Sequence, residues 1–373
     1  MRAARGLAVL LVACSPPSGP TNDAGVHDAG VHDAGVHDAG AADAGAPKAA
    51  QLAVELDRLC VRFDDGSVSC WCPAASQTFG SLVASDAGIL HLAASAYGGL
   101  CAVHRGGEVS CAAGVSATCA RPLQRVAGVA GAAEVSVGGR HACARLVDGG
   151  VRCWGDDGAG QLGHDAGLGL SAVRQVAAAE AHTCALLEGG TVWCWGRTEL
   201  YDGTSVVGPT PMPFGGLAGV ARVAGGVRGE GSTDEGGYGC VCFGDGGVAC
   251  WGDNWMGRSG NATDQPHAAP ISSLTSGVEL ALGHHSCAVQ LDAGVECWGY
   301  NASGQLGSGE VSIRSTIPVA VVDLPAVIEV AVGGYASCAR TAGGDVYCWG
   351  APFGGTLPDG GLSARPTRVW PRP

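Results

Sequence analysis

Basic residues are scarce in this chain. Lysine occurs once, as Lys48, and no run of Lys and Arg appears anywhere in the 373 residues. The formal net charge is -13 at pH 7. Nucleic-acid binding depends on clustered Lys and Arg that release counterions from phosphates, so this composition argues against a nucleic-acid binder.

Charged residues and long apolar runs are also few. Only 15% of the residues are charged, whereas Gly contributes 64 residues and Pro 18. No stretch reaches the roughly 18 apolar residues that a membrane-spanning helix needs. Few charges together with abundant Gly and Pro predict many short strands joined by tight turns, with little helix.

The N-terminus has the layout of an export signal. Two arginines precede a short apolar run that ends immediately before Cys14. This resembles a bacterial lipoprotein signal, in which the chain is cleaved before the cysteine and the cysteine carries the lipid. We therefore expect residues 1–13 to be a signal peptide and Cys14 to be lipidated in the cell envelope, with the outer membrane or cell surface favoured. The alternative is an ordinary secretory signal with a chance cysteine, which would make the protein secreted.

Residues 14–50 are of low complexity and repeat the unit DAGVH. They contain almost nothing to bury, so we expect a flexible, acidic tether between the lipid and a folded body. His27, His32 and His37, each followed by Asp, suggest metal binding, since imidazole and carboxylate are good ligands. A spacing of five residues matches no known ligand geometry, and a plain spacer is therefore the favoured interpretation.

From residue 51 to residue 373 the chain is internally periodic. Cysteines ten positions apart occur seven times, and the first cysteines of successive units are 41 to 56 residues apart, as in propeller blades or solenoid turns. In an exported chain such pairs indicate disulfides rather than metal clusters. The pairs are Cys60 with Cys70, Cys101 with Cys111, Cys143 with Cys153, Cys184 with Cys194, Cys240 with Cys250, Cys287 with Cys297, and Cys338 with Cys348.

Each pair surrounds a turn sequence. In CARLVDGGVRCWG, residues 143–155, strand-like residues lie on both sides of an Asp-Gly, which supplies the positive φ that a hairpin turn needs. The turn is centred between the cysteines, so pairing in register places them opposite each other. Opposed Cα atoms in an antiparallel pair are about 4.5 to 5.5 Å apart, within reach of a disulfide. The spacing therefore predicts seven cross-strand disulfides.

Two units continue into a longer signature. CWGDDGAGQLG at 153–163 and CWGYNASGQLG at 297–307 follow VSVGGRHACA and LALGHHSCA respectively. They resemble repeats of the regulator of chromosome condensation family. This resemblance implies an all-β fold, a seven-bladed propeller over residues 51–373, whose loops usually bind other proteins.

In that family the ends of the chain share a blade. ARPTRVWP, residues 364–371, resembles the outer strand that precedes each unit, so the resemblance implies that it closes the ring against the first unit. The founding member of the family exchanges guanine nucleotide on a nuclear GTPase. An exported, acidic chain without a basic surface is not expected to share that activity.

Two motifs suggest chemistry. Residues 158–163 fit the dinucleotide fingerprint GxGxxG, but a loop rather than a helix follows them, which favours a tight turn between blades. His141, His182 and His285 each lie two residues before the first cysteine of a unit. They are interpreted as hydrogen-bonding between blades rather than as a metal ring. No catalytic motif, cofactor site or metal site is apparent.

Three cysteines lie outside Cys14 and the seven pairs. Cys72 and Cys119 follow adjacent hairpins and are candidates for an eighth disulfide. Cys242 is then odd, and it competes with Cys240 for Cys250; a free thiol and an alternative pairing both remain open.

Unit five contains an insertion, GVRGEGSTDEGGYGC at 226–240. Its Glu230, Asp234 and Glu235 lie in a Gly-rich excursion, which is either a partner-binding loop or tolerated drift.

Together these features predict a lipid-anchored, monomeric protein-interaction scaffold outside the cytoplasm, with an unknown protein partner and no catalysis. One alternative is a hydrolase or lyase with its site in the propeller funnel. The other is nucleotide exchange by analogy with the family.

Overall fold

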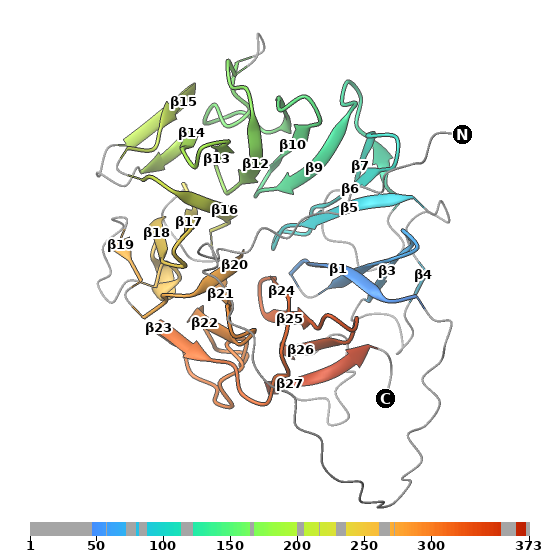
Figure 1. The fold of residues 1–373 in the computed structure, drawn as a ribbon, viewed down its shortest axis with the longest axis vertical. Coiled ribbons are helices and arrows are strands. Elements are labelled where there is room, and N and C mark those ends of the chain that lie inside the picture. Colours follow the sequence, from blue (N-terminus) through green and yellow to red (C-terminus); the bar gives the residue numbers. More distant parts are fainter. Residues whose placement is uncertain are drawn as a thin grey trace, which may run out of the picture.

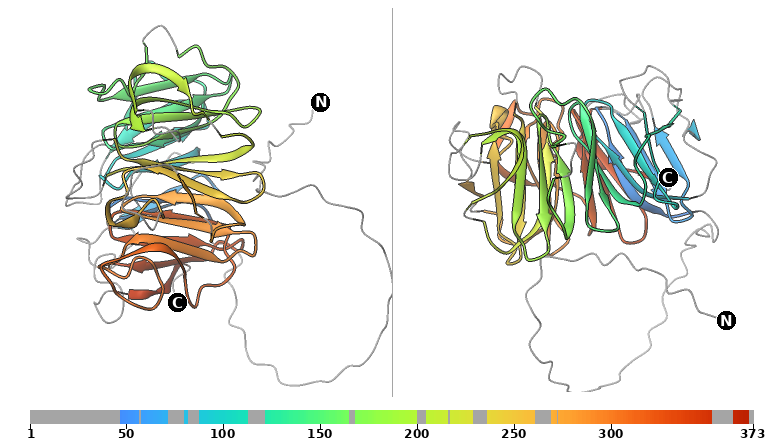
Figure 2. Two further views of the ribbon diagram at one scale, coloured as in Figure 1. Left: turned by 90° about the vertical axis from the view of Figure 1, so that its left-hand side faces the viewer. Right: turned by 90° about the horizontal axis from the view of Figure 1, so that it is seen from above.

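Seven antiparallel sheets form a ring around a common axis (Figure 1). We call each sheet a blade and number the blades in chain order. The computed structural model describes residues 47–56, 58–71, 80–81, 88–112, 122–164, 168–199, 205–215, 217–228, 236–260, 269–271, 273–351 and 363–370. The expected all-β, seven-bladed propeller is confirmed, and the strands run from one face of the ring to the other (Figure 2).

Each blade begins with its innermost strand. These first strands are β1 (Ala49–Val54), β5 (Ile89–Ala94), β9 (Ala132–Val137), β12 (Val173–Ala178), β16 (Val220–Gly226), β20 (Gly277–Leu282) and β24 (Glu329–Val332). The second strands are β2 (Leu59–Phe63), β6 (Leu100–His104), β10 (His141–Leu146), β13 (His182–Leu187), β17 (Tyr238–Phe243), β21 (His285–Gln290) and β25 (Ala336–Arg340).

The third strand pairs with the second in every blade. The third strands are β3 (Val68–Trp71), β7 (Val109–Ala112), β11 (Val151–Gly155), β14 (Val192–Glu199), β18 (Val248–Gly252), β22 (Val295–Tyr300) and β26 (Val346–Gly350). The outer fourth strands are β4 (Gly80–Ser81), β8 (Gln124–Arg125), β15 (Ser205–Pro213), β19 (Ala269–Pro270), β23 (Arg314–Ala320) and β27 (Ser363–Trp370). Within the described residues blade three has no fourth strand, and one short 3-10 turn, η1 (Trp255–Gly257), follows β18.

The second and third strands form the predicted stapled hairpins. In β10 and β11, Cys143 lies opposite Cys153, and Gly149 in the turn has φ +82°. All seven cysteine pairs are in register and bonded, with Cα atoms 4.0 to 4.1 Å apart. They lie at non-hydrogen-bonded positions of the ladder, where opposed Cα atoms are closest. The seven predicted disulfides are confirmed.

The hydrophobic core lies between adjacent blades. Seven clusters of buried side chains fill the seven interfaces, and they consist mainly of Val, Ala, Leu and cystine, with a Trp in most of them. Blades one and seven share one cluster, which includes Leu52, Phe63, Val346 and Val369. Because every blade packs against two neighbours, apolar burial closes the ring without an edge.

Ring closure differs from the prediction. β27 pairs with β26, so the segment at 364–371 is the fourth strand of blade seven. Blade one is built from β1 to β4 alone, and the chain ends do not share a blade. The expectation of a shared blade was wrong because the outer strand follows its hairpin instead of preceding it. Side-chain packing between blades one and seven closes the ring instead.

The propeller also begins slightly earlier than its predicted boundary at residue 51. Strand β1 starts at Ala49, and the backbone N of Lys48 donates to Asp64 Oδ1 at 3.1 Å. Residues 1–46, including the predicted signal peptide, Cys14 and His27, His32 and His37, lie outside the described residues. In the part of the chain that the structure describes, no helix has the length and apolar character to cross a bilayer.

Candidate functional site: the two faces and the central channel

The ring has two distinct faces. We call the face formed by the connections from first to second strands the loop face. The face formed by the hairpin turns between second and third strands is the turn face. The residues that hold the blades together lie between these faces and serve the fold.

The signature GQLG forms a clasp between blades. After β22, the carbonyl of Gln305 accepts two hydrogen bonds from blade seven, from Trp349 Nε1 at 2.8 Å and from Ser337 Oγ at 2.9 Å. Both donors are buried, so each hydrogen bond also satisfies a polar group that burial would otherwise penalise. The Trp that follows the second cysteine is therefore an interblade donor as well as a core residue.

The same clasp occurs at two other interfaces. Gln161 O accepts from Trp195 and Thr183, and Arg258 O accepts from Trp298 and Ser286, at 2.8 to 2.9 Å. The glycines of the clasp allow close approach to the next blade. Gly304 has φ +75°, and a Cβ on it would lie 2.8 Å from the Cα of Ala364 in β27. Residues 158–163 therefore form a blade-connecting turn, as expected.

The three singled-out histidines bond between blades, which confirms the structural interpretation. His141 Nε2 lies 2.8 Å from Thr183 Oγ1, and His285 Nε2 lies 2.5 Å from Ser337 Oγ. His182 Nδ1 donates to the carbonyl of Gly236 at 2.8 Å. Burial lowers the pKa of His141 and His182 to about 4 and that of His285 to about 3, so all three are neutral at physiological pH.

A belt of polar side chains lines the central channel, one from the same position of each first strand. These side chains are Gln51, His91, Glu134, Gln175, Arg222, Glu279 and Glu329. Most of them accept a hydrogen bond from the backbone N of the next blade's first strand. The acceptor oxygen lies 2.9 Å from the backbone N of Leu92 for Gln51, 3.0 Å from that of Val223 for Gln175, and 2.8 Å from that of Leu52 for Glu329. The belt therefore ties the inner strands together across blade boundaries.

Glu279 is the exceptional member of this belt. Burial, and then the charge of Glu329, raise the pKa of Glu279 to about 8, although Arg222 and Arg340 act in the opposite direction. Glu329 itself forms an ion pair with Arg340, with Oε2 of Glu329 2.6 Å from Nε of Arg340. Two carboxyl groups therefore share one region of the channel wall, and a proton on Glu279 removes their repulsion.

We expect Glu279 to make the propeller less stable as the pH rises from about 4.5 to about 8. The unfolded carboxyl loses its proton near 4.5, whereas the folded one keeps it until about 8, so deprotonation opposes folding in that window. Glu279→Gln should therefore stabilise the fold at pH 8 by on the order of 1 to 3 kcal/mol and have little effect at pH 5. Thermal unfolding at both pH values measures this difference.

Gln is tolerated at the same position in blades one and four, as Gln51 and Gln175. Glu188→Gln, on an exposed hairpin turn, is the matched control and should not change the pH dependence. Equal effects of Glu279→Gln at pH 5 and pH 8 would contradict the raised pKa.

The channel also encloses a cavity of about 190 Å³. Its lining is largely Ala, Val and Leu from the first strands of blades two to six, together with Glu134 and Gln175 of the belt. Within the described ranges, no group of three or more His, Cys, Asp or Glu side chains could hold a metal ion. Ser95 and Ser136 also line the cavity, whereas Glu134 and Gln175 are belt members, at the position that ties neighbouring first strands together.

The structure describes only some of the remaining predicted residues. Cys242 is buried in β17, and Cys240 rather than Cys242 bonds to Cys250. The alternative pairing is therefore not adopted. Cys72, Cys119, Glu230, Asp234 and Glu235 lie outside the described residues, so the eighth disulfide and the acidic loop remain predictions.

A family model describes this blade. The regulator of chromosome condensation (RCC1) repeat matches residues 132–161, 173–199 and 327–353. Each match begins at or near a first strand and reaches at least the end of the third strand of blade three, four or seven. The RCC1 repeat model thus matches three of the seven blades. Comparison with curated proteins finds no match to the chain.

Solved structures share the fold of these RCC1 repeats. Human WBSCR16 is 20% identical over 77% of this chain and 83% of its own, with a TM-score of 0.61. The CRINKLY WD40 ectodomain of the Arabidopsis thaliana receptor kinase ACR4 is 17% identical over 86% of this chain and 99% of its own, with a TM-score of 0.51. Prp20p from Saccharomyces cerevisiae, for which binding to Gsp1p and histones is described, is 18% identical over 63% and 76%, with a TM-score of 0.40. At these identities the likeness concerns the fold alone.

Sequence reasoning missed the belt and the role of the RCC1 tryptophan. The belt was visible in principle, because a polar residue precedes a Val or Leu in all seven first strands, for example in Gln51-Leu52 and Glu279-Leu280. The partners of the tryptophan were not visible, because the Gln carbonyl that it reaches belongs to the preceding repeat.

Proposed function

We propose that this chain is a lipid-anchored protein-interaction scaffold outside the cytoplasm, acting as a monomer and without catalysis. The observation that carries the proposal is how the chemically versatile side chains are used. Fourteen cysteines are in disulfides, and three buried histidines bond between blades. The ring is a platform whose connecting segments lie at its two faces, and binding residues are commonly found in such loops.

The disulfides also support the proposed compartment. Structural disulfides persist in oxidising environments, and this chain places one in every blade. With the export-like N-terminus and the low-complexity tether, they favour a body held outside the cytoplasm by a lipid on Cys14.

Lipidation can be tested by metabolic labelling with an alkyne fatty acid. Cys14→Ser should abolish the label and release the protein from the membrane fraction, because the lipid supplies the membrane affinity. Ser15→Ala is the matched control and should keep both properties. Label on Cys14→Ser, or a membrane-free wild-type protein, would contradict the anchor.

The scaffold function can be tested by crosslinking on intact cells that express the full chain. We expect a covalent complex with another protein at the cell envelope. A cytoplasmic protein with reduced cysteines would contradict both the compartment and the function.

A further inference from the structure

Five aromatic rings form a continuous arc on the loop face. In spatial order they are Tyr97, His284, Tyr335, Tyr300 and Trp255, with centroid separations of 6.1, 5.7, 6.3 and 5.8 Å. Tyr97 belongs to blade two and His284 to blade six, on the opposite side of the ring (Figure 1). The arc therefore crosses the mouth of the central channel. His284 is buried, and the other four rings are partly exposed.

The fold does not need aromatic residues at these positions. The position of Trp255 is occupied by Gly158 in blade three and by Ala302 in blade six. The position of Tyr335 is occupied by Ala181 in blade four. Equivalent blades thus form with small residues there, although only 5% of the chain is aromatic. The fold does not require aromatic rings at these positions, so their clustering at one place indicates a binding role.

Blade five departs from its sister blades in backbone as well as in side chains. Its clasp includes the 3-10 turn η1, in which Met256 has φ +58°. A positive φ strains the backbone of a non-Gly residue, and such strain often accompanies functional positions. The strained residue directly follows Trp255 and thereby helps to set the position of its ring.

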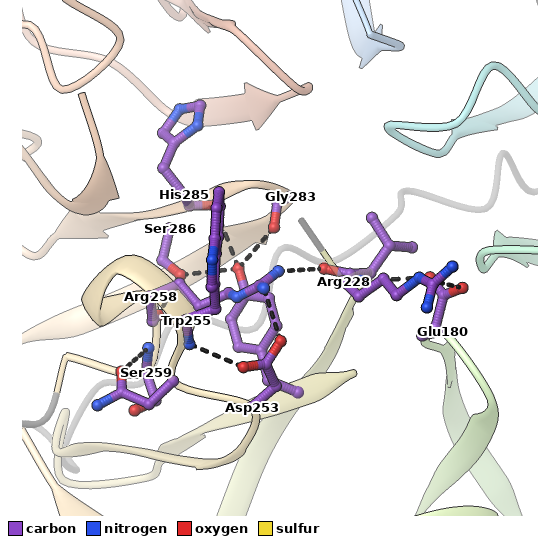
Figure 3. A network of polar contacts seen from close by, with 12 residues as sticks. Glu180, Arg228, Asp253, Trp255, Arg258, Ser259, Gly283, His285 and Ser286 are labelled. Atoms are coloured by element: carbon purple, nitrogen blue, oxygen red, sulfur yellow. Dashed lines mark hydrogen bonds and ion pairs between the residues drawn. The ribbon is translucent and has the colours of Figure 1, made fainter. Parts of the chain in front are cut away.

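Polar contacts around Trp255, at one end of the arc, hold its ring in place (Figure 3). Arg258 lies over the rings of Trp255 and Tyr238, each 5.3 Å from its guanidinium carbon, and donates to Asp253 Oδ2 at 2.6 Å and to Val227 O at 2.7 Å. Asp253 Oδ1 accepts from the backbone N of Trp255 at 2.7 Å. Rings that are already ordered lose little entropy on binding, which favours affinity.

The opposite end of the arc is held in the same way. The hydroxyl of Tyr97 donates to the carbonyl of Arg228 at 2.6 Å, and Arg228 in turn contacts Glu180, its backbone N donating to Oε2 at 3.2 Å. Among the described residues, the charged side chains next to the two ends of the arc form two opposite-charge pairs, Arg258 with Asp253 and Arg228 with Glu180. A partner segment needs no net charge to match them.

Exposed aliphatic side chains extend the arc outwards. The backbone N of Asn301, next to Tyr300, donates to the carbonyl of Ile313 at 3.0 Å. Ile313 is 71% exposed and Val311 is 53% exposed. Aromatic rings, an arginine and neighbouring aliphatic groups together have the composition of hot spots in protein interfaces.

The turn face carries exposed carboxylates and is the face at which the chain enters the propeller. Exposed carboxylates lie in five of the hairpin turns on the turn face: Asp64, Asp65, Asp148, Glu188, Asp245 and Asp292. Lys48, which contacts Asp64, shows that the chain enters blade one at this face.

We propose that the aromatic arc binds an extended, uncharged polypeptide segment, carrying proline or aliphatic side chains, of a partner protein. This inference rests on the proposed scaffold function and assigns it a face and a class of ligand. Proline-rich segments dock onto grooves lined by Tyr and Trp because they are already extended and expose apolar rings. The internally paired charges of the arc favour such a segment over a charged one.

The test is selection from a displayed library of random linear peptides on the full-length protein, followed by affinity measurements. Trp255→Ala and Tyr335→Ala place at these positions residues that sister blades already carry, and each should weaken the selected peptides by about tenfold or more. Asp245→Asn and Asp292→Asn on the turn face are the controls and should bind as the wild type does. Binding should change little with salt, because no net charge is involved.

A further variant keeps the test decisive if either aromatic substitution disturbs folding. Ile313→Ser changes an exposed side chain beside the arc and should also weaken binding, with an unchanged unfolding temperature. Peptides that bind all three variants as tightly as the wild type would overturn the arc proposal and leave the scaffold function standing. Arc-dependent binding of a glycan array without peptide binding would overturn the ligand class. Failure to bind any peptide, together with no crosslinked partner, would overturn both proposals.

Discussion

Reducing the disulfides is expected to prevent the unfolded chain from recovering the propeller. Each staple closes a loop between cysteines ten positions apart and contributes about 2.5 to 3 kcal/mol in the chain-entropy model. Seven such contributions are an upper bound, because hairpins are partly formed in the unfolded chain. Even half of that sum is comparable with the net stability of about 5 to 15 kcal/mol of a typical domain.

The measurement is refolding from guanidinium with and without reductant, monitored by circular dichroism and tryptophan fluorescence. The oxidised chain should recover its native spectrum, since every pair is local, whereas the reduced chain should not. As a graded control, the double variant Cys184→Ala/Cys194→Ala removes one staple and should destabilise the fold by about 2 to 3 kcal/mol. Equal recovery with and without reductant would show that the interblade cores suffice.

Removing the clasp tryptophan of blade six should have the largest effect of any single substitution considered. Trp298 is fully buried, and its Nε1 donates to Arg258 O at 2.8 Å. Trp298→Ala should cost about 3 to 5 kcal/mol, because it leaves a large cavity between blades five and six. Trp298→Phe keeps most of the volume and should cost about 1 to 3 kcal/mol, chiefly through the lost hydrogen bond.

Trp251 is the matched control for this prediction. It occupies the same position in blade five and is equally buried, but its Nε1 has no hydrogen-bond partner among the described residues. Trp251→Phe should therefore cost clearly less than Trp298→Phe in denaturant unfolding, since it removes an unsatisfied polar group. Equal costs for the two substitutions would mean that ring packing, and not the clasp, accounts for the tryptophan.

The pairing of strands within a blade could be predicted from the sequence because the paired residues lie close together in the chain. Two cysteines ten residues apart around Asp-Gly determine the hairpin, its register and its disulfide, and seven copies of that unit determine the number of blades. The structural interpretation of His141 and His285 was favoured because only three of the seven units carry a histidine at this position. The predicted pairing of the segment at 364–371 was wrong. The sequence of a strand does not show whether it pairs with the hairpin before it or with the one after it.

The aromatic arc could not be predicted from the spacing of residues within one repeat. The insertion at 226–240 had two interpretations, a partner-binding loop or tolerated drift, and its acidic residues lie outside the described residues. The arc instead draws on residues from Tyr97 to Tyr335, which are far apart in the chain. A signal existed in the comparison of sister blades, where Trp255 and Tyr335 stand in place of small residues.

The sequence by itself determined the blade: its strands, its turn, its staple and its sevenfold repetition, because each depends on contacts within about 25 residues of chain. Only the tertiary structure decided how the blades meet. Packing between neighbours closes the ring, which brings the loop of blade two opposite that of blade six and so places Tyr97 beside His284. The channel belt, the clasps and the arc all arise at such boundaries, because their partners are supplied by a neighbouring blade and not by neighbouring sequence.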